Sequence, residues 1–121
     1  MISDPTELGR LANQYYTSKQ YELAAEAYDR LLTFGPNVEI YNNLGITLFN
    51  MGRAGEALTA LNEGAALDPS YQRIWLTLGF VNSRVGNVEE ARQALTTAVG
   101  MGTDNDVGQS AQQMLDDLPP A

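Results

Sequence analysis

The chain of 121 residues contains no cysteine and no histidine. Without cysteine there is no disulfide framework and no thiolate nucleophile. The usual zinc ligands are also missing, as is the side chain that most often acts as a general base near neutral pH. The sequence therefore predicts no catalytic residue, no metal site and no cofactor, and we expect the protein not to be an enzyme.

Basic residues are also scarce, with seven Lys and Arg against fifteen Asp and Glu, which gives a net charge of −8. An acidic surface repels phosphate backbones and anionic lipids, so we expect neither a nucleic acid nor a membrane partner. No apolar run is long enough to span a membrane. The N-terminal residues 1–5 have no basic head or apolar block, which predicts no secretory signal. We expect a cytoplasmic protein, or a periplasmic one if a signal has been removed.

The strongest pattern in the chain is an internal repeat of 33 or 34 residues. Each copy has a leucine followed by a small residue, and an alanine twelve residues further on. The three copies are Leu11-Ala12 with Ala24, Leu44-Gly45 with Ala57, and Leu78-Gly79 with Ala91. Pro36 and Pro69 end the first two copies.

This pattern resembles the tetratricopeptide repeat, which has an aromatic residue, a Leu-Gly pair, a later alanine and a terminal proline on a period of about 34 residues. The resemblance implies an all-α fold, a right-handed α-solenoid of three helix hairpins with a C-terminal capping helix. It implies one domain over residues 1–121, with repeats at about 5–37, 38–71 and 72–105 and the capping helix at about 105–118.

Helix start and stop signals divide the chain in the same way. Asp4 to Glu7 and Asn87 to Glu90 have the sequence of a capping box, and Gly52 and Gly86 suit the left-handed position that ends a helix. The predicted helices are about 5–17, 21–33, 38–51, 54–67, 71–85, 88–100 and 105–118. Val107, Ala111, Met114, Leu115 and Leu118 form an apolar stripe that should cover the third hairpin.

Close contacts between paired helices are expected at the small residues. We expect Gly45 and Gly79 to meet Ala57 and Ala91, which would let the two helices of a hairpin approach closely. Tyr15, Tyr28 and Tyr41 fall on repeat positions and are interpreted as packing residues.

In tetratricopeptide arrays the first helix of each hairpin lines a concave groove. The resemblance therefore places in that groove Asn13, Tyr16, Thr17, Asn42, Ile46, Phe49, Asn50, Arg73, Leu76, Phe80 and Arg84. Most acidic residues fall on the second helices instead. The function implied is a protein–protein interaction module, such as an adaptor, co-chaperone or assembly factor. Its partner would be a peptide or helix that is apolar with a negative group.

Other interpretations stay open at this point. The apolar groove residues could contact the chain's own ends, or the groove could hold another copy, so that the protein is a self-assembling scaffold; both a monomer and a homo-oligomer are possible. One subfamily grips the C-terminal carboxylate of chaperones. Asn13, Asn43 and Arg73 match its clamp, but Gly9 and Thr77 replace two of its basic residues.

Asp104 and Asp106 lie between two glycines and faintly resemble a calcium loop. The spacing of the loop and its closing glutamate are absent. We interpret these carboxylates as an acidic N-terminus for the last helix, where they interact favourably with the helix dipole.

Overall fold

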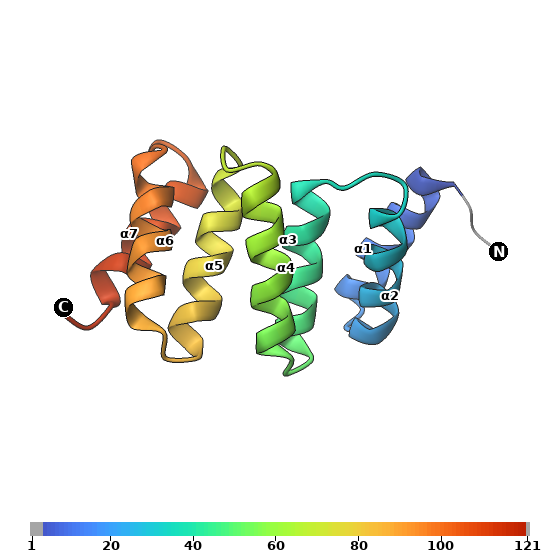
Figure 1. The fold of residues 1–121 in the computed structure, drawn as a ribbon, viewed down its shortest axis with the longest axis horizontal. Helices are drawn as coiled ribbons and strands as arrows, with labels where there is room; N and C mark the ends of the chain where they lie inside the picture. The colour runs from blue at the N-terminus through green and yellow to red at the C-terminus, as the bar shows by residue number, and fades with distance from the viewer. Residues whose placement is uncertain (1–3, 121) are drawn as a thin grey trace.

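The computed structural model describes residues 4–120. Within this range the chain folds entirely into α-helices and short connections, as Figure 1 shows. The helices are α1 (Pro5–Thr17), α2 (Tyr21–Leu32), α3 (Val38–Asn50), α4 (Ala54–Leu67), α5 (Gln72–Arg84), α6 (Val88–Gly100) and α7 (Asp106–Asp117). The prediction of no secretory signal rests partly on residues 1–3, which lie outside the described residues.

The predicted helix boundaries are confirmed to within one residue at each end. Local signals explain this agreement. The Asp4 side chain accepts a hydrogen bond from the Thr6 backbone N–H at 3.1 Å, which satisfies one free donor at the start of α1. Gly52 and Gly86 adopt φ values of 78° and 87°, where a side chain would be strained.

The predicted capping box at Asn87 is wrong. The Asn87 side chain makes no cap contact to α6; instead its Nδ2 donates to Asn82 Oδ1 at 3.1 Å. Glu89 pairs with Arg92 at 3.1 Å. The asparagine is therefore used to join the end of α5 to the start of α6, a contact that depends on the tertiary fold.

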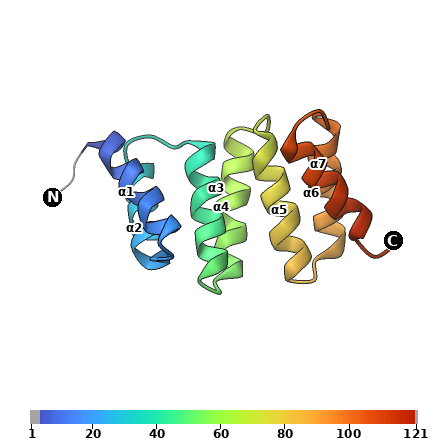
Figure 2. The ribbon, with the colours of Figure 1, turned by 180° about the vertical axis from the view of Figure 1, so that it is seen from behind.

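The helices form three antiparallel hairpins, α1/α2, α3/α4 and α5/α6, arranged in a row. Contacts of α2 with α3 and of α4 with α5 join successive hairpins, and α7 packs on α5 and α6. Figure 1 views the row from the side of α2, α4 and α6, and Figure 2 from the side of α1, α3, α5 and α7.

Glycines permit the closest approach inside the hairpins, and the atoms nearest to them belong to leucines of the facing helices. A Cβ atom on Gly45 would lie 2.5 Å from Leu61 Cγ, and one on Gly79 would lie 2.5 Å from Leu95 Cγ. The expected partners Ala57 and Ala91 are buried, yet the nearest atoms belong to the leucines four residues further along. The glycines therefore accommodate a large side chain from the facing helix.

The last helix closes one end of the row, as predicted. Ala111 is buried, and Met114, Leu115 and Leu118 pack with Leu95 and Ala98 of α6 in a third core cluster. This covers the apolar side of the last hairpin, as the ends of helical solenoids require.

A network of hydrogen bonds holds the turn between α6 and α7 in place. Gln72 Nε2 donates to the carbonyl oxygens of Ala98 at 2.9 Å and of Gly102 at 2.8 Å. Asn105 Nδ2 donates to Gln72 Oε1 at 3.1 Å, and Asn105 Oδ1 caps α7 by accepting from the Gly108 N–H at 2.7 Å. One glutamine at the start of α5 therefore holds the turn that positions the last helix.

The acidic turn before α7 has the role expected of a helix start. Asp106 is the first residue of α7, where a carboxylate interacts favourably with the helix dipole. Over residues 4–120, no three acidic side chains lie close enough together to hold a metal ion. Over the same range, every helix is too short or too polar to cross a membrane.

Candidate functional site

A hollow of about 470 Å³ is lined mainly by residues of α1, α3 and α5. Figure 2 shows the side of the molecule on which these three helices lie. The lining of the hollow consists of Asn13, Tyr16, Thr17, Tyr28, Glu39, Asn42, Asn43, Ile46, Tyr71, Arg73 and Thr77. The first helices supply most of these side chains because the loops within hairpins are short and keep α1, α3 and α5 on one side. We call this feature the groove hollow.

Six of the predicted groove residues line the groove hollow. They are Asn13, Tyr16, Thr17, Asn42, Ile46 and Arg73. The other five predicted residues lie outside it and have other contacts.

Phe49 and Phe80 form an aromatic pair beside the groove hollow, from the C-terminal halves of α3 and α5. Their ring centroids are 5.4 Å apart and their planes meet at 74°, an edge-to-face arrangement. The guanidinium of Arg84 lies 5.0 Å from the Phe80 centroid. Both rings are half-buried. Phe49 packs against the core between the first two hairpins and against the core between the second and third, and Phe80 packs against the latter. Part of the area of each ring therefore stabilises the fold.

Leu76 and Asn50 are also engaged within the protein. Leu76 packs with the cluster that includes Met114 and Leu115 of α7. For Leu76 the interpretation that apolar groove residues contact the chain's own end is therefore right. Asn50 Nδ2 donates to Tyr16 Oη at 3.3 Å and to the Ile46 carbonyl at 3.0 Å, which links α3 to α1.

Tyr28 of α2 was interpreted as a packing residue, yet it also reaches the groove hollow. Its ring is buried, with 3% of the residue exposed, and its hydroxyl donates to Asn13 Oδ1 at 2.6 Å. Burial raises the pKa of Tyr28 to about 12, and the neighbouring Tyr16 adds to the increase. The signal for this role is the hydroxyl itself, because the equivalent positions 33 and 67 residues later are Leu61 and Leu95.

Asn42 lines the groove hollow but is buried rather than exposed, with 5% of the residue accessible. Its Oδ1 atom is buried and has no hydrogen-bond partner. A buried acceptor without a partner costs about 1–3 kcal/mol of stability. This unused acceptor is itself shielded from the groove hollow, so it is a cost to the fold.

The charges of the groove hollow are mixed. Arg73 from α5 and Glu39 from α3 both line it, whereas Arg84 lies apart at the Phe80 ring. Burial raises the pKa of Tyr71 in the same lining; Glu39 raises it further and Arg73 lowers it. The predicted pair of groove arginines is therefore divided between two places.

The structure brings four of the residues at the carboxylate-clamp positions together, but it supplies no further basic residue at these positions. Asn13, Asn43, Arg73 and Thr77 line the groove hollow together. Asn13 already accepts the Tyr28 hydroxyl, and Thr77 Oγ1 donates to the Arg73 carbonyl at 3.1 Å. Of the residues at clamp positions that line the hollow, Arg73 alone carries a positive charge.

Comparison with known proteins identifies several relatives. The peroxisomal targeting signal receptor of Kluyveromyces lactis is 29% identical over 101 residues, which cover 83% of this chain but 18% of the receptor. The chain thus spans less than a fifth of the length of that relative.

Solved structures share the same fold. The type III secretion chaperone SycD of Yersinia enterocolitica, in complex with a peptide of the translocator YopD, superposes with a TM-score of 0.85 at 22% identity. The match covers 94% of this chain and 92% of that one. The first TPR domain of Spaghetti (RPAP3), bound to an HSP90 peptide, superposes with a TM-score of 0.84 at 20% identity, covering 93% and 87% of the two chains.

The sequence model of the tetratricopeptide repeat matches residues 48–115, more than half of the chain. This match includes α4, α5 and α6 and most of α7, and the three helix hairpins agree with it. The chain belongs to the tetratricopeptide repeat family.

Proposed function

We propose that the protein is an interaction module, an adaptor, co-chaperone or assembly factor, that binds a peptide or helix of another protein in the groove hollow. The observation that carries the proposal is the convergence of side chains from α1, α3 and α5 on one hollow of about 470 Å³. A site of this size accepts a few side chains of a peptide, since small-molecule pockets span about 300–1,000 Å³.

The lining indicates the chemistry of the partner. Ile46, Tyr16 and Tyr71 offer apolar and aromatic contact, and Arg73 offers a positive charge. These features favour a segment that carries apolar side chains and one negative group.

The same binding surface extends along α3 and α5. Asn50, Phe80 and Arg84 lie beyond the groove hollow on the C-terminal halves of these helices, and the Phe49 ring packs edge-to-face on that of Phe80. Leu76 lies one turn before Phe80 on α5 and packs with the core cluster of α6 and α7. A partner longer than the hollow would continue over this region.

A partner of different sequence is favoured over a second copy of this chain. Both structural neighbours described above were solved with a peptide from another protein. Neither peptide identifies the partner here, because at 20–22% identity the likeness concerns the fold. We further infer that the protein acts by binding rather than by catalysis.

The test is a selection of peptides from a random display library on the native protein, followed by dissociation constants for two variants. Arg73→Ser removes the positive charge of the groove hollow, and Ile46→Ser removes its apolar centre. Arg10→Ser is the matched control, because this exposed arginine on α1 pairs with Glu7 and does not line the hollow.

We expect selected peptides to combine apolar and acidic residues and to bind either groove variant at least tenfold more weakly than the native protein. The control should bind as the native protein does. Peptides that bind all three variants equally would contradict the proposal. Sedimentation tests the second-copy alternative, which requires a mass that rises with concentration.

A further inference from the structure

A second hollow, of about 550 Å³, lies between α2 and α4 on the other side of α3. The two hollows use opposite faces of α3, because successive helical residues turn by about 100°. Leu44 and Leu48 point to the second hollow, and Asn42 and Ile46 to the first. We call this second hollow the outer cleft.

The floor of the outer cleft is apolar. Leu32 of α2, Leu44 and Leu48 of α3 and Met51 directly after α3 form it, together with the ring of Tyr41. Leu44 and Leu48 are buried, and the other three are half-buried. The first two hairpins meet along this line, so these side chains serve the core on one side and form the cleft floor on the other.

The walls of the outer cleft are acidic. They carry Glu22, Glu26 and Asp29 on α2 and Glu56 and Glu63 on α4. The one basic residue of this lining is Arg53, so the lining carries a net charge of −4, from five carboxylates and one guanidinium.

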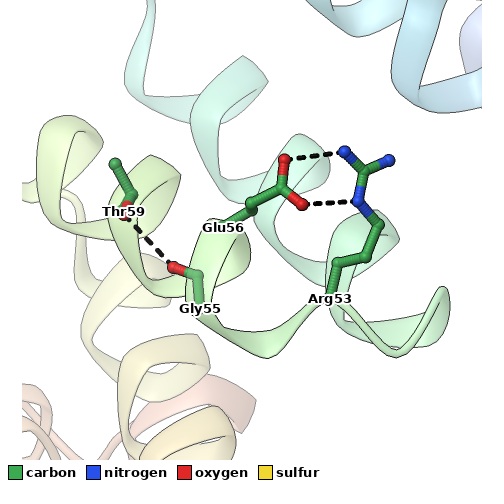
Figure 3. A network of polar contacts seen from close by, with 4 residues as sticks. All are labelled: Arg53, Gly55, Glu56 and Thr59. Atoms are coloured by element: carbon green, nitrogen blue, oxygen red, sulfur yellow. Dashed lines mark hydrogen bonds and ion pairs between the residues drawn. The ribbon is translucent and has the colours of Figure 1, made fainter.

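Arg53 is already engaged by a single carboxylate, as Figure 3 shows. Its Nε and Nη2 atoms donate to the two oxygens of Glu56 at 2.6 and 2.7 Å. This bidentate pair holds the guanidinium against Glu56, and its charge also acts on Glu22 and Asp29 of the opposite wall. Burial raises the pKa of Asp29, an effect that Arg53 reduces and Glu56 increases.

An internal comparison shows that the repeat does not require this charge. The equivalent cleft between α4 and α6, of about 460 Å³, is lined by residues 33 or 34 positions later in the chain. There Asn62 and Thr97 stand where the outer cleft has Asp29 and Glu63. The two clefts share an architecture and differ in charge.

The carboxylates of the outer cleft are spread along two walls rather than gathered at a point. Over residues 4–120, no three acidic side chains are close enough to ligate one ion. An extended cation therefore fits the cleft better than a metal does.

We propose that the outer cleft is a second docking site, which binds a basic amphipathic segment of a partner protein. Apolar side chains of the segment would rest on the half-buried Leu32 and Met51, and its lysines or arginines would face Asp29 and Glu63. Opposite charges across an interface speed encounter and select the partner, while the apolar contact provides burial. The outer cleft shares no lining residue with the groove hollow, so binding at each site can be tested independently of the other.

The test uses a labelled short peptide that alternates arginine with leucine and has blocked ends. Its dissociation constant is measured by fluorescence anisotropy at low salt. The double variant Asp29→Asn, Glu63→Thr gives the outer cleft the residues that the equivalent cleft has at these two positions, and it changes the net charge of the lining from −4 to −2. A matched control, Asp116→Asn with Asp117→Asn, removes the same charge from the exposed side of α7.

We expect the cleft variant to raise the dissociation constant about three- to tenfold, because it removes two exposed ion pairs, each of which contributes modestly to binding. The control should change it less than twofold. Replacing leucine by serine in the peptide should weaken binding to the native protein. In NMR spectra the peptide should shift the amide signals of Leu48 and Met51 and leave those of Asn42 and Ile46 in place.

Three results would overturn the proposal. Equal weakening in the cleft variant and the α7 control would show that net charge alone attracts the peptide. Unchanged binding in the cleft variant would place the peptide elsewhere. A serine peptide that binds as tightly as the leucine peptide would show that the apolar floor is not used. Circular dichroism of each variant separates these outcomes from misfolding.

Discussion

Replacing Gly108 by alanine should detach the last helix from the rest of the fold. Gly108 lies in the first turn of α7, buried against the turn that precedes it. A Cβ atom there would overlap the Gly102 carbonyl oxygen and lie 2.8 Å from the Gly102 carbonyl carbon. It would also lie 2.9 Å from Thr103 Cα. These are backbone atoms, so no side-chain rotation relieves the overlap.

The expected cost follows from the contacts that must move. Overpacking typically costs about 1–3 kcal/mol, and a rigid backbone neighbour favours the upper part of that range. Displacing Gly102 also disturbs its hydrogen bond from Gln72, and each lost bond is worth about 0.5–1.5 kcal/mol. Alanine returns about 1 kcal/mol through its helix propensity. We therefore expect a net loss of about 1.5–3.5 kcal/mol in unfolding free energy.

Urea unfolding followed by two signals provides the assay. Trp75 is the single tryptophan of the chain and packs in the cluster beneath α7, so its fluorescence reports on that end. Circular dichroism reports on all helices. Because solenoid ends can open separately, the fluorescence midpoint of Gly108→Ala should fall further than the dichroism midpoint.

Gly100→Ala is the matched control at the same end of the molecule, since a Cβ atom there meets nothing within 4 Å. It should be neutral or slightly stabilising. If Gly108→Ala behaved like Gly100→Ala in both signals, the tight docking of α7 against residues 102–103 would be refuted.

Three further predictions concern the core and the groove. Gly45→Val should lower the unfolding free energy in urea by about 1–3 kcal/mol, because its Cβ would lie 2.5 Å from Leu61 Cγ; an unchanged value would contradict this packing. The double variant Phe49→Ser, Phe80→Ser should lose more than about 2 kcal/mol in thermal unfolding, since the rings pack on each other and on the core; a loss below about 1 kcal/mol would identify them as surface anchors. Burial raises the pKa of Tyr28 from 10.0 to about 12, so between these pH values the hydroxyl ionises in the unfolded chain but stays neutral in the folded protein. The free energy of unfolding should therefore fall as the pH rises from 10 to 12, and Tyr28→Phe should lose less stability than the native protein over that interval.

The sequence was sufficient for the helices because their signals are local and repeated. Pro36 follows α2 and Pro69 follows α4, where each prevents continuation of the helix, and Gly52 supplies the left-handed residue after α3. Three copies of one pattern also determine how sequential helices pair. The prediction of α7 as a cap succeeded because its apolar stripe is one-sided.

The candidate site was only partly predictable, because exposure depends on neighbours distant in sequence. Leu76 has the helical position of a groove residue, but α7 covers it. Asn42 has a polar side chain at an expected surface position, yet it is buried. Tyr28 belongs to a second helix and reaches the groove hollow only because its hydroxyl extends past the core to Asn13.

For the two phenylalanines, the sequence predicted the side of the helix but not the contact between their rings. Helical spacing placed Phe49 and Phe80 on the groove side, but it could not show that their rings touch. Their contact divides the aromatic area between fold stability and any binding role. Distinguishing these two contributions requires measuring stability and binding on the same variants.

The most direct test of the central claim, that the groove hollow binds the partner peptide, is an NMR titration of the protein with a peptide selected on it. Binding in the groove hollow predicts chemical-shift changes at Asn13, Asn43 and Ile46, which line it, together with loss of these changes in Arg73→Ser. Shift changes confined to α2, α4 and α6, with the groove residues unaffected, would contradict the claim.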